Sequence, residues 1–589
     1  MAGDKDTIDI DLDTSKIKDW RSIITLVVFV LTNLVVLFPF HTPIPVPWWF
    51  SDAVSDTLSA VRIMPPRQKP SAQNGSANEQ PGRHGRFRML MFPMNYVTAP
   101  LIADLFLLAI LAIGRKELHD GTIGANNISP IDIMAFFLTL AYIAISIDAS
   151  GLIRYLAFRV LKWGGQEGHR LFFYLYAFFF ALGSFIGNDP IILSGTAFLA
   201  YMTRVSSNIV HPRAWIHSQF AVANIASAIL VSSNPTNLVL AGAFDIKFIH
   251  YTANMIVPVV ITAIVLFPFL LYIIFLDETL IPVKINLHEL PEEVRARKPV
   301  NPNIPHARGE AEGQVDNPSN DDQAKLLPLE EIMNPFLDKG GAAFGAVIMA
   351  VTLITLSVVN ALSTSSGHWY VYWVTLPAAF VMLCWDVAFG WYHRHETREI
   401  ARKGREAFER AKAERAERDR EEAEARRTPQ MLAHLPYELV PFAFAMFVLV
   451  QALVTKGWVP VFAYGWDHWV NKTGTFAGTN IGTTILLSRV IQAWTEIHAI
   501  NHEPITDRTF WATVYSLALG VNYDAFSTAI SASLAGLLWR DILGKKHIKV
   551  RPLEFAKVNL PIIALAMTVG CVVLVAEVYI IRDTKPYHL

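Results

Sequence analysis

Apolar residues in this chain are grouped into blocks of roughly 20, the length that a helix needs to cross the ~30 Å hydrocarbon core of a bilayer. Hydrophobic residues make up 52% of the 589 positions. A soluble protein of this size would instead split into several domains with polar surfaces. The blocks predict an all-α polytopic membrane protein with about 10 transmembrane helices plus two re-entrant helical hairpins. The predicted spans are residues 23–40, 92–113, 131–149, 171–200, 215–241, 255–275, 341–359, 369–390, 435–453, 474–493, 509–537 and 557–581.

The charge balance and the cysteines exclude several kinds of partner. The formal net charge is −1 at pH 7, so no basic field points to nucleic acid. Cys384 and Cys571 both fall in apolar segments, where they are interpreted as packed residues and not as a disulfide or a metal site. The chain is therefore expected to contact membrane lipid and to carry no cofactor.

Polar stretches divide the apolar blocks. Residues 62–88 are rich in Pro, Gly, Ser, Asn and Arg, a composition typical of disorder. Residues 391–433 are predicted to form a solvated charged helix, because oppositely charged residues such as Glu399 and Lys403 recur four positions apart. The predicted organisation is a polar tail (1–22), N-terminal helices (23–129), a first repeat (130–275), a polar linker (276–340), additional helices (341–390), the charged helix (391–433), a second repeat (434–582) and a tail (583–589).

The charged helix also orients the chain, because cytoplasmic loops carry an excess of Lys and Arg. Placing 391–433 in the cytosol puts the linker 276–340 on the same side. The basic loops agree with this count only if 171–200 and 474–493 are hairpins that each enter and leave on one face. The first hairpin would then enter from the cytosol and the second from the opposite face.

The two halves repeat one order of elements. Each has a plain span, a hairpin containing Gly and Asn, a helix with a polar break, and a last span containing proline. The hairpin Asn and the break Asn are 46 positions apart in the first half (188 to 234) and 42 apart in the second (480 to 522). Inverted repeats of broken helices are typical of secondary transporters with a binding site at the membrane midplane.

Proline and asparagine at these positions disfavour a continuous helix. Pro190 and Pro235 lack the N–H that a helix needs and disfavour helix in the residue before them. Asparagine is a poor interior residue but a good cap for a freed helix end. A freed helix N-terminus attracts anions, whereas unwound carbonyls suit cations. The candidate binding residues are Asn188, Asp189, Ser233, Asn234, Thr236 and Asn237 in the first half, and Thr479, Asn480, Thr483, Asn522 and Asp524 in the second.

Several motifs in this order resemble the arsenite-permease and citrate-transporter branch of the ion transporter superfamily, over residues 130–275 and 435–581. The motifs are Ile147–Leu152, Gly187–Pro190, Ser233–Leu238, Leu435–Tyr437 followed by Met446–Val448, and Ser531–Trp539. The resemblance implies paired re-entrant hairpins, two inverted repeats with broken helices and alternating access, often in homodimers.

The sequence departs from the sodium–dicarboxylate branch of that superfamily, which carries Ser-Asn-Thr in both repeats. Here Pro235 splits the first motif, and the second half has Asn522-Tyr523-Asp524 instead. Coupling to Na⁺, around Asn188, Asn234 and Asn480, therefore stays open beside coupling to H⁺. Protons would be carried by Asp189 or Asp524.

Ionisable residues near the bilayer centre cost about 2.5–3.5 kcal/mol on insertion scales and are mostly functional. This favours a role in function for Asp189 and Asp524. Asp148 lies near a span end, where a helix cap and a functional role are both open. Asp386 is expected to be interfacial, and His217 is expected to be a solvated or capping residue at the start of its span.

Ion-coupled secondary active transport of a small inorganic or organic anion, of the arsenite or carboxylate class, agrees best with these patterns. Na⁺/H⁺ antiport is the alternative. An intramembrane aspartyl protease is disfavoured because Tyr523-Asp524 has no Gly-x-Gly-Asp partner, and no ring-type filter motif indicates a channel. No Gly-x-Ser-Gly serine site and no HExxH zinc site indicates an enzyme, and no Walker A loop indicates ATP-driven transport. A plasma membrane or a vacuolar or endosomal membrane is the expected location.

Overall fold

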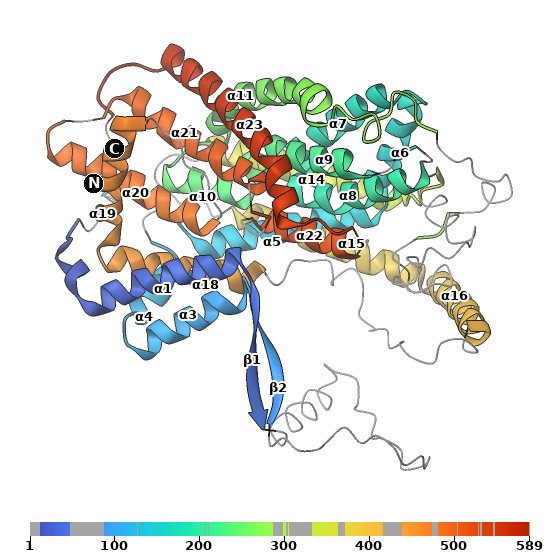
Figure 1. Cartoon of the computed structure of the whole chain (residues 1–589), viewed down its shortest axis with the longest axis horizontal. Helices are drawn as coiled ribbons and strands as arrows, with labels where there is room; N and C mark the ends of the chain where they lie inside the picture. The colour runs from blue at the N-terminus through green and yellow to red at the C-terminus, as the bar shows by residue number, and fades with distance from the viewer. Residues whose placement is uncertain are drawn as a thin grey trace.

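Long helices make up most of the computed structural model of the chain (Figure 1). The residues that it describes are 12–47, 87–125, 128–206, 208–209, 211–286, 299–301, 304, 333–362, 371–415, 439–473, 481–503, 505–527, 529–530, 533–545 and 548–587.

Seven helices in the described ranges are long and apolar enough to cross a membrane. They are α1 (Trp20–Leu37), α5 (Pro130–Ala149), α7 (Gly168–Ile186), α11 (Phe248–Phe269, continued by a π-helical turn over Leu270–Ile274), α14 (Lys339–Leu362), α15 (Tyr372–Tyr392) and α23 (Pro552–Ile581). An eighth span results if α18 (Leu439–Thr455) and α19 (Trp458–Thr473), bent by 84° at Gly457, are counted together. This measure counts only uninterrupted apolar helices of the described residues, so it leaves out the predicted spans that are interrupted.

The N-terminal region differs most from the prediction. Strands β1 (Phe40–Pro47) and β2 (Phe87–Met94) form an antiparallel hairpin, so the chain is not entirely helical. The predicted span 92–113 is a strand end followed by a short helix, α3 (Thr98–Ala109), and then α4 (Arg115–Thr122). Pro43, Pro45 and Pro47 occupy every second position of β1, so the positions that lack an N–H all face one edge of the strand. A strand tolerates proline at such an edge. Of the predicted disordered stretch, residues 62–86 lie outside the described residues.

Within the predicted charged helix 391–433, the structure describes one helix. Helix α16 covers Arg394–Arg415 and continues from α15. Lys403 lies 2.7 Å from Glu399, and Arg402 lies 3.2 Å from Glu406. Residues 416–433 and most of the predicted linker 276–340 lie outside the described residues.

Two helices interrupted near their middle lie at the centre of the fold. The first consists of α9 (Arg213–Ala226), a 3₁₀ turn (Val231–Ser233) and α10 (Pro235–Ala243). The second consists of α21 (Asp507–Tyr523), a 3₁₀ turn (Asp524–Phe526) and α22 (Leu534–Lys545). The predicted spans 215–241 and 509–537 are therefore broken helices, as expected.

The broken helices run antiparallel to each other. At one end Phe244, which follows α10, meets Phe510 at the start of α21, with ring centroids 5.8 Å apart. At the other end His217, near the start of α9, meets Trp539 of α22, with ring centroids 5.1 Å apart. The second segment of each broken helix is therefore next to the first segment of the other.

Helices next to the broken helices also pack against the opposite half of the chain. Helix α8 (Asn188–Val205) packs against α22 of the other half, and α20 (Ile481–Ile500) packs against α10. The last long helices, α11 and α23, pack against each other. Elements at corresponding places in the two halves thus make corresponding contacts.

The halves are not identical before their hairpin asparagines. In the first half, α6 (Leu152–Gly164) and α7 separate α5 from Asn188, whereas α19 is the one helix described between α18 and α20. The described part of the predicted hairpin 474–493 is a continuous helix that extends to Ile500, so its other arm would have to come from α19, which packs against it. Residues 474–480 lie outside the described residues.

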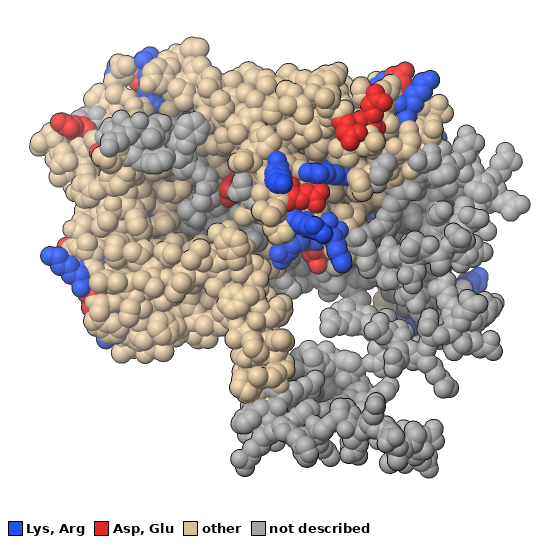
Figure 2. Space-filling model, in the orientation of Figure 1, with Lys and Arg blue, Asp and Glu red and all other residues tan. Residues whose placement is uncertain are grey.

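Large apolar side chains cover the outside of the long helices. Ile354, Phe380, Val387 and Ile580 are each more than 60% exposed. Figure 2 shows broad areas of this face without charged side chains, with the described charges gathered in a few clusters. An apolar surface of this extent agrees with contact to lipid.

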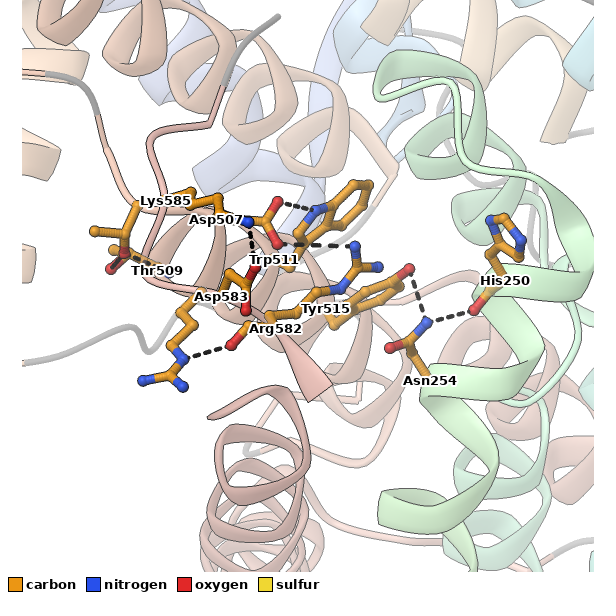
Figure 3. A network of polar contacts seen from close by, with 11 residues as sticks. His250, Asn254, Asp507, Thr509, Trp511, Tyr515, Arg582, Asp583 and Lys585 are labelled. Atoms are coloured by element: carbon orange, nitrogen blue, oxygen red, sulfur yellow. Dashed lines mark hydrogen bonds and ion pairs between the residues drawn. The ribbon is translucent and has the colours of Figure 1, made fainter. Parts of the chain in front are cut away.

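The chain after α23 turns back and lies along the start of α21 (Figure 3). The backbone N–H of Tyr587 donates to the carbonyl of Ile505 at 2.7 Å, and that of Asp507 donates to the carbonyl of Lys585 at 2.9 Å. The Tyr587 ring stacks on Phe510, with centroids 3.7 Å apart. The tail therefore ties the end of α23 to the start of the second broken helix.

We expect Tyr587→Ala to weaken this attachment. The lost stacking on Phe510 contributes about 0.5–1.5 kcal/mol beyond the buried area. Thermal unfolding of the purified protein should shift down by a few degrees, and Tyr272→Ala, at an exposed position in the π-helical turn, should leave it unchanged.

The same attachment should depend on pH at alkaline values. Burial raises the pKa of Tyr587 from 10.0 to about 12. Because the folded state holds this proton more tightly, the contribution of Tyr587 is complete below pH 10 and is lost as the pH rises toward 12. A wild-type protein whose stability falls no faster than that of Tyr587→Phe over this range would contradict the assignment.

Candidate functional site

The first break begins at Ser227, where α9 ends, and closes at Asn234. The side-chain oxygen of Asn234 accepts hydrogen bonds from the backbone N–H of Thr236 at 3.2 Å and from its hydroxyl at 2.9 Å. Pro235 occupies the first position of α10, where a helix needs no N–H donor. The local sequence therefore stops one helix and starts the next, as the residue types predicted.

Asn522, the last but one residue of α21, joins the two breaks. Its side-chain oxygen accepts from Asn234 Nδ2 at 3.1 Å and from Ser227 Oγ at 3.2 Å. Its amide nitrogen donates to Asn237 Oδ1 at 2.6 Å and to the carbonyl of Ala518 at 2.8 Å. We call the contacts of Asn522 with Ser227, Asn234 and Asn237 the asparagine bridge. All four of its residues are buried or half-buried.

Two further hydrogen bonds hold the first hairpin, α7 and α8, against the first broken helix. Asn188 is the first residue of α8, and its Nδ2 donates to Asn224 Oδ1 at 2.9 Å. Ser233 Oγ donates to the carbonyl of Ser184, near the end of α7, at 2.9 Å. The structure therefore brings together Asn188, Ser233, Asn234, Thr236, Asn237 and Asn522 from the predicted set.

Of the two predicted acids, one lies at the hairpin turn beside the first break and the other lies at the second break. Asp189 is in the first turn of α8, next to Asn188, and Asp524 begins the 3₁₀ turn after Asn522. Both residues are half-buried. A carboxylate in the first turn of a helix is stabilised by the helix dipole, so the position of Asp189 alone agrees with both a structural and a functional role.

The remaining predicted residues belong to the second hairpin. Thr483 lies in the first turn of α20. Thr479 and Asn480 lie outside the described residues. Their proposed participation stays a prediction.

Two other acids connect α5 to neighbouring helices. Asp386 of α15 is half-buried and accepts hydrogen bonds from Tyr142 at 2.7 Å and from Ser146 at 2.8 Å, both on α5. Asp148 is buried and accepts a hydrogen bond from Ser194 of α8. Asp148 therefore ties the plain span α5 to the first hairpin.

Arg489 is a residue that the sequence analysis missed. It lies in α20, is 5% exposed, and donates to Gln492 Oε1 at 3.3 Å and to the carbonyl of Ala125. Gln492 in turn donates to the carbonyl of Ala243 at the end of α10, at 2.7 Å. A single arginine inside the apolar run 474–493 was the available signal, since charges within such runs are rare.

We expect Gly187→Ala to disrupt the turn between α7 and α8. Gly187 has φ +97°, and an added Cβ would lie 2.9 Å from the carbonyl oxygen of Ser233. Strain of this kind costs about 1–3 kcal/mol, so thermal unfolding should occur at a clearly lower temperature.

Gly390→Ala, in α15, is the matched control, because a Cβ there meets no atom within 4 Å. It should leave stability unchanged or raise it slightly. Equal effects of the two substitutions would show that the turn at Gly187 imposes no special constraint.

Known proteins share sequence with parts of this chain. A family model described as citrate transporter matches residues 75–391, which is more than half of the chain and includes the first broken helix. The chain belongs to the citrate transporter family. This member of the family is therefore a multi-pass integral membrane transporter of a small molecule, and not an enzyme.

Individual relatives match over shorter stretches. An arsenical pump membrane protein of Escherichia coli is 28% identical over 191 residues, which are 32% of this chain and 44% of that protein. An arsenical pump membrane protein of Yersinia enterocolitica is 26% identical over 190 residues, 31% of this chain and 43% of that protein. The match thus spans less than half the length of these relatives. Among solved structures, the YdaH transporter of Alcanivorax borkumensis aligns over 94% of this family member and 98% of its own chain, with 13% identity and a TM-score of 0.40.

Proposed function

We propose that this protein is a secondary active transporter that moves a small anion by alternating access, coupled to an ion. The asparagine bridge is the observation that carries this proposal. It joins interruptions from two halves of the chain, almost 300 residues apart, at one buried place. Unwound backbone at membrane depth is tolerated only where it lines protein or a cavity, so two such interruptions facing each other favour a binding site.

An inverted repeat is the proposed arrangement of the two halves. The antiparallel course of the broken helices and the exchanged contacts of α8 with α22 and of α20 with α10 support it. Alternating access in such transporters is a movement of one part against another around a central site. Hydrogen bonds between the two breaks are the contacts that such a movement would alter.

An anion is the proposed substrate class. Helix α10 begins at the first break, and α8 begins at the hairpin turn beside it. Helix N-termini present N–H groups and a partial positive charge. The family description names citrate, and the relatives are arsenical pump proteins. A small oxygen-rich anion is therefore proposed, with Asn188, Asp189, Ser233, Asn234, Thr236, Asn237, Thr479, Asn480, Thr483, Asn522 and Asp524 as its binding region.

Na⁺/H⁺ antiport is the second candidate function. Two carboxylates favour it, Asp189 at the hairpin turn beside the first break and Asp524 at the second break. Carboxylates can bind either cation, and side-chain and backbone oxygens of the breaks could complete a Na⁺ site. In this alternative the two acids bind the transported ions themselves.

Transport in proteoliposomes tests both candidates. Purified protein is reconstituted, a Na⁺ or H⁺ gradient is imposed, and uptake of labelled citrate, arsenite, phosphate or sulfate is measured beside Na⁺-dependent pH change. Gradient-driven uptake of one anion supports the first function, and Na⁺-dependent pH change without anion supports the second. If neither gradient drives any of these fluxes, both proposals are wrong.

A further inference from the structure

Helix α5 and the turn before it contact α8 and α20, the second arms of the two predicted hairpins, each through a buried charged side chain. In the view of Figure 1, α5 lies between α20, on the left, and α8, on the right. At its C-terminal end α5 meets α8, where Ser194 donates a hydrogen bond to Asp148. The turn before its N-terminal end meets α20, where Arg489 donates to the carbonyl of Ala125. Asp148, Ser194 and Arg489 are all buried.

The two contacts are separated by the whole length of α5. The turn is tied to the helix, because the backbone N–H of Ile128, two residues before α5 begins, donates to the carbonyl of Ala125 at 3.1 Å. From Pro130 to Asp148 the helix rises about 27 Å, close to the ~30 Å of a bilayer core. Helix α8 is therefore attached near one end of this span and α20 near the other. This agrees with the opposite entry predicted for the two hairpins.

The face of α5 opposite Asp148 is fixed to α15. Thr139 Oγ1 donates to Thr375 Oγ1 at 2.8 Å, and Ser146 Oγ donates to Asp386 Oδ2 at 2.8 Å. With 3.6 residues per turn, Asp148 lies about 180° around the helix from Thr139 and about 200° from Ser146. Helix α5 thus has one face held by α15 and the opposite face bonded to α8.

On α8 the attachment is close to the binding region. Ser194 is six residues after Asn188, which is about 9 Å along the helix. Thr196, about 200° around α8 from Ser194, donates instead to Gln219 of α9 at 2.9 Å. Gln219 also donates to the carbonyl of Ile191 at 2.8 Å. Helix α8 is therefore held between α5 and the first broken helix.

Helix α20 is held in a corresponding way. Arg489 attaches it to the turn before α5, and Gln492 donates to the carbonyl of Ala243, the last residue of α10, at 2.7 Å. The predicted binding residue Thr483 is six residues before Arg489. Each hairpin helix thus has one contact with a broken helix and one charged contact with α5 or its turn.

We propose that Asp148 and Arg489 are positioning residues, which fix α8 and α20 on α5 as a common support. Both act through the hairpin helices and not by touching the substrate. Asp148 keeps the start of α8, with Asn188, against the first break, and Arg489 keeps the start of α20 in place from the other end of α5. An effect on transport rests on the proposed function, whereas the hold on the two helices does not.

Amide hydrogen exchange in the full-length protein tests the hold on α8. Asp148→Ala should speed exchange at least tenfold in peptides covering 188–198, because loss of the attachment favours local opening. Asp148→Asn keeps an acceptor for the Ser194 hydroxyl and should restore slow exchange. Thr139→Val, the control, removes a hydrogen bond on the opposite face of α5 and should leave these peptides unchanged. Unchanged exchange in Asp148→Ala would overturn the proposal.

The second attachment supplies a reciprocal test. Arg489→Leu should speed exchange in peptides covering 484–494 of α20 and leave 188–198 unchanged, and Asp148→Ala should do the reverse. Ser194→Ala, a smaller change, takes the place of Asp148→Ala if that protein does not fold. Faster exchange of both helices in each single variant would indicate general destabilisation and would overturn the positioning roles.

Transport kinetics in proteoliposomes test the effect on the binding region. Asp148→Ala and Ser194→Ala should each raise KM at least fivefold, and the double variant should raise it no further, because both remove the same contact. Asp148→Asn should keep the wild-type KM. If the wild type transports nothing, the proposed function is wrong and the exchange result still decides the hold on α8. If α8 exchanges faster in Asp148→Ala while KM is unchanged, the attachment has no part in binding and that part of the proposal is wrong.

Discussion

Asn522→Ala is expected to abolish transport, with a loss of about 100-fold or more, equivalent to about 2.7 kcal/mol. The substitution removes every contact of the asparagine bridge. It leaves Ser227 Oγ, Asn234 Nδ2 and Asn237 Oδ1 without their partner on the other half. A buried polar group left unpaired costs about 1–3 kcal/mol, so the geometry of both breaks should change. Uptake of the identified substrate in proteoliposomes measures the effect.

Two comparisons make this result specific. Asn237→Ala removes one partner of Asn522 and should also impair transport. Asn33→Ala, on α1, removes an amide that donates to the carbonyl of Phe29 on its own helix at 2.8 Å, and should leave transport unchanged. A folded Asn522→Ala protein that transports at half the wild-type rate or faster would exclude the asparagine bridge from the site.

Asp189→Asn is expected to uncouple transport while the protein remains folded. The substitution keeps the size of the side chain at the first turn of α8 and removes only its charge. Gradient-driven flux should fall at least tenfold, because no carboxylate remains at the first hairpin turn to bind the coupling ion. Asp524→Asn should have a comparable effect at the second break.

Asp277→Asn is the matched control for these acids. Asp277 lies beyond α11 and accepts a hydrogen bond from the Thr279 N–H at 2.8 Å. The amide oxygen of the substituted side chain can still accept this bond, so transport should equal that of the wild type. Unchanged gradient-driven flux in Asp189→Asn would remove Asp189 from the coupling mechanism, even if Asp524 proved essential.

Local sequence was sufficient to locate both broken helices. Pro235 and Asn234 stop one helix and start the next through contacts within three residues, so no distant partner is needed to predict the interruption. The same applies to α16, whose charge pattern makes a solvated helix in isolation. The length of an apolar run was a weaker guide to helical structure. The predicted span 92–113 begins in β2, whose residues 87–94 pair with residues 40–47 of β1.

Other features depended on partners that no local pattern identifies. His217 was expected to be solvated because it begins an apolar run, yet Trp539 and Phe555 from more than 300 positions away enclose it. Asp386 likewise accepts hydrogen bonds from Tyr142 and Ser146 of α5, partners 240 or more positions away that no local pattern indicates. The burial of a polar residue is set by the helices that pack against it, and packing of this kind is not encoded within one span.

The sequence by itself determined that this protein crosses a membrane several times, that each half contains an interrupted helix, and which asparagines and acids lie at the interruptions. These properties follow from apolar length and from the backbone chemistry of Pro and Asn, which act over a few residues. Only the tertiary structure decided that Asn522 bonds to Asn234 and Asn237, that the broken helices run antiparallel, and that aromatic rings enclose His217. Hydrogen bonds between side chains nearly 300 positions apart depend on how the helices pack, and that is settled by the whole chain at once.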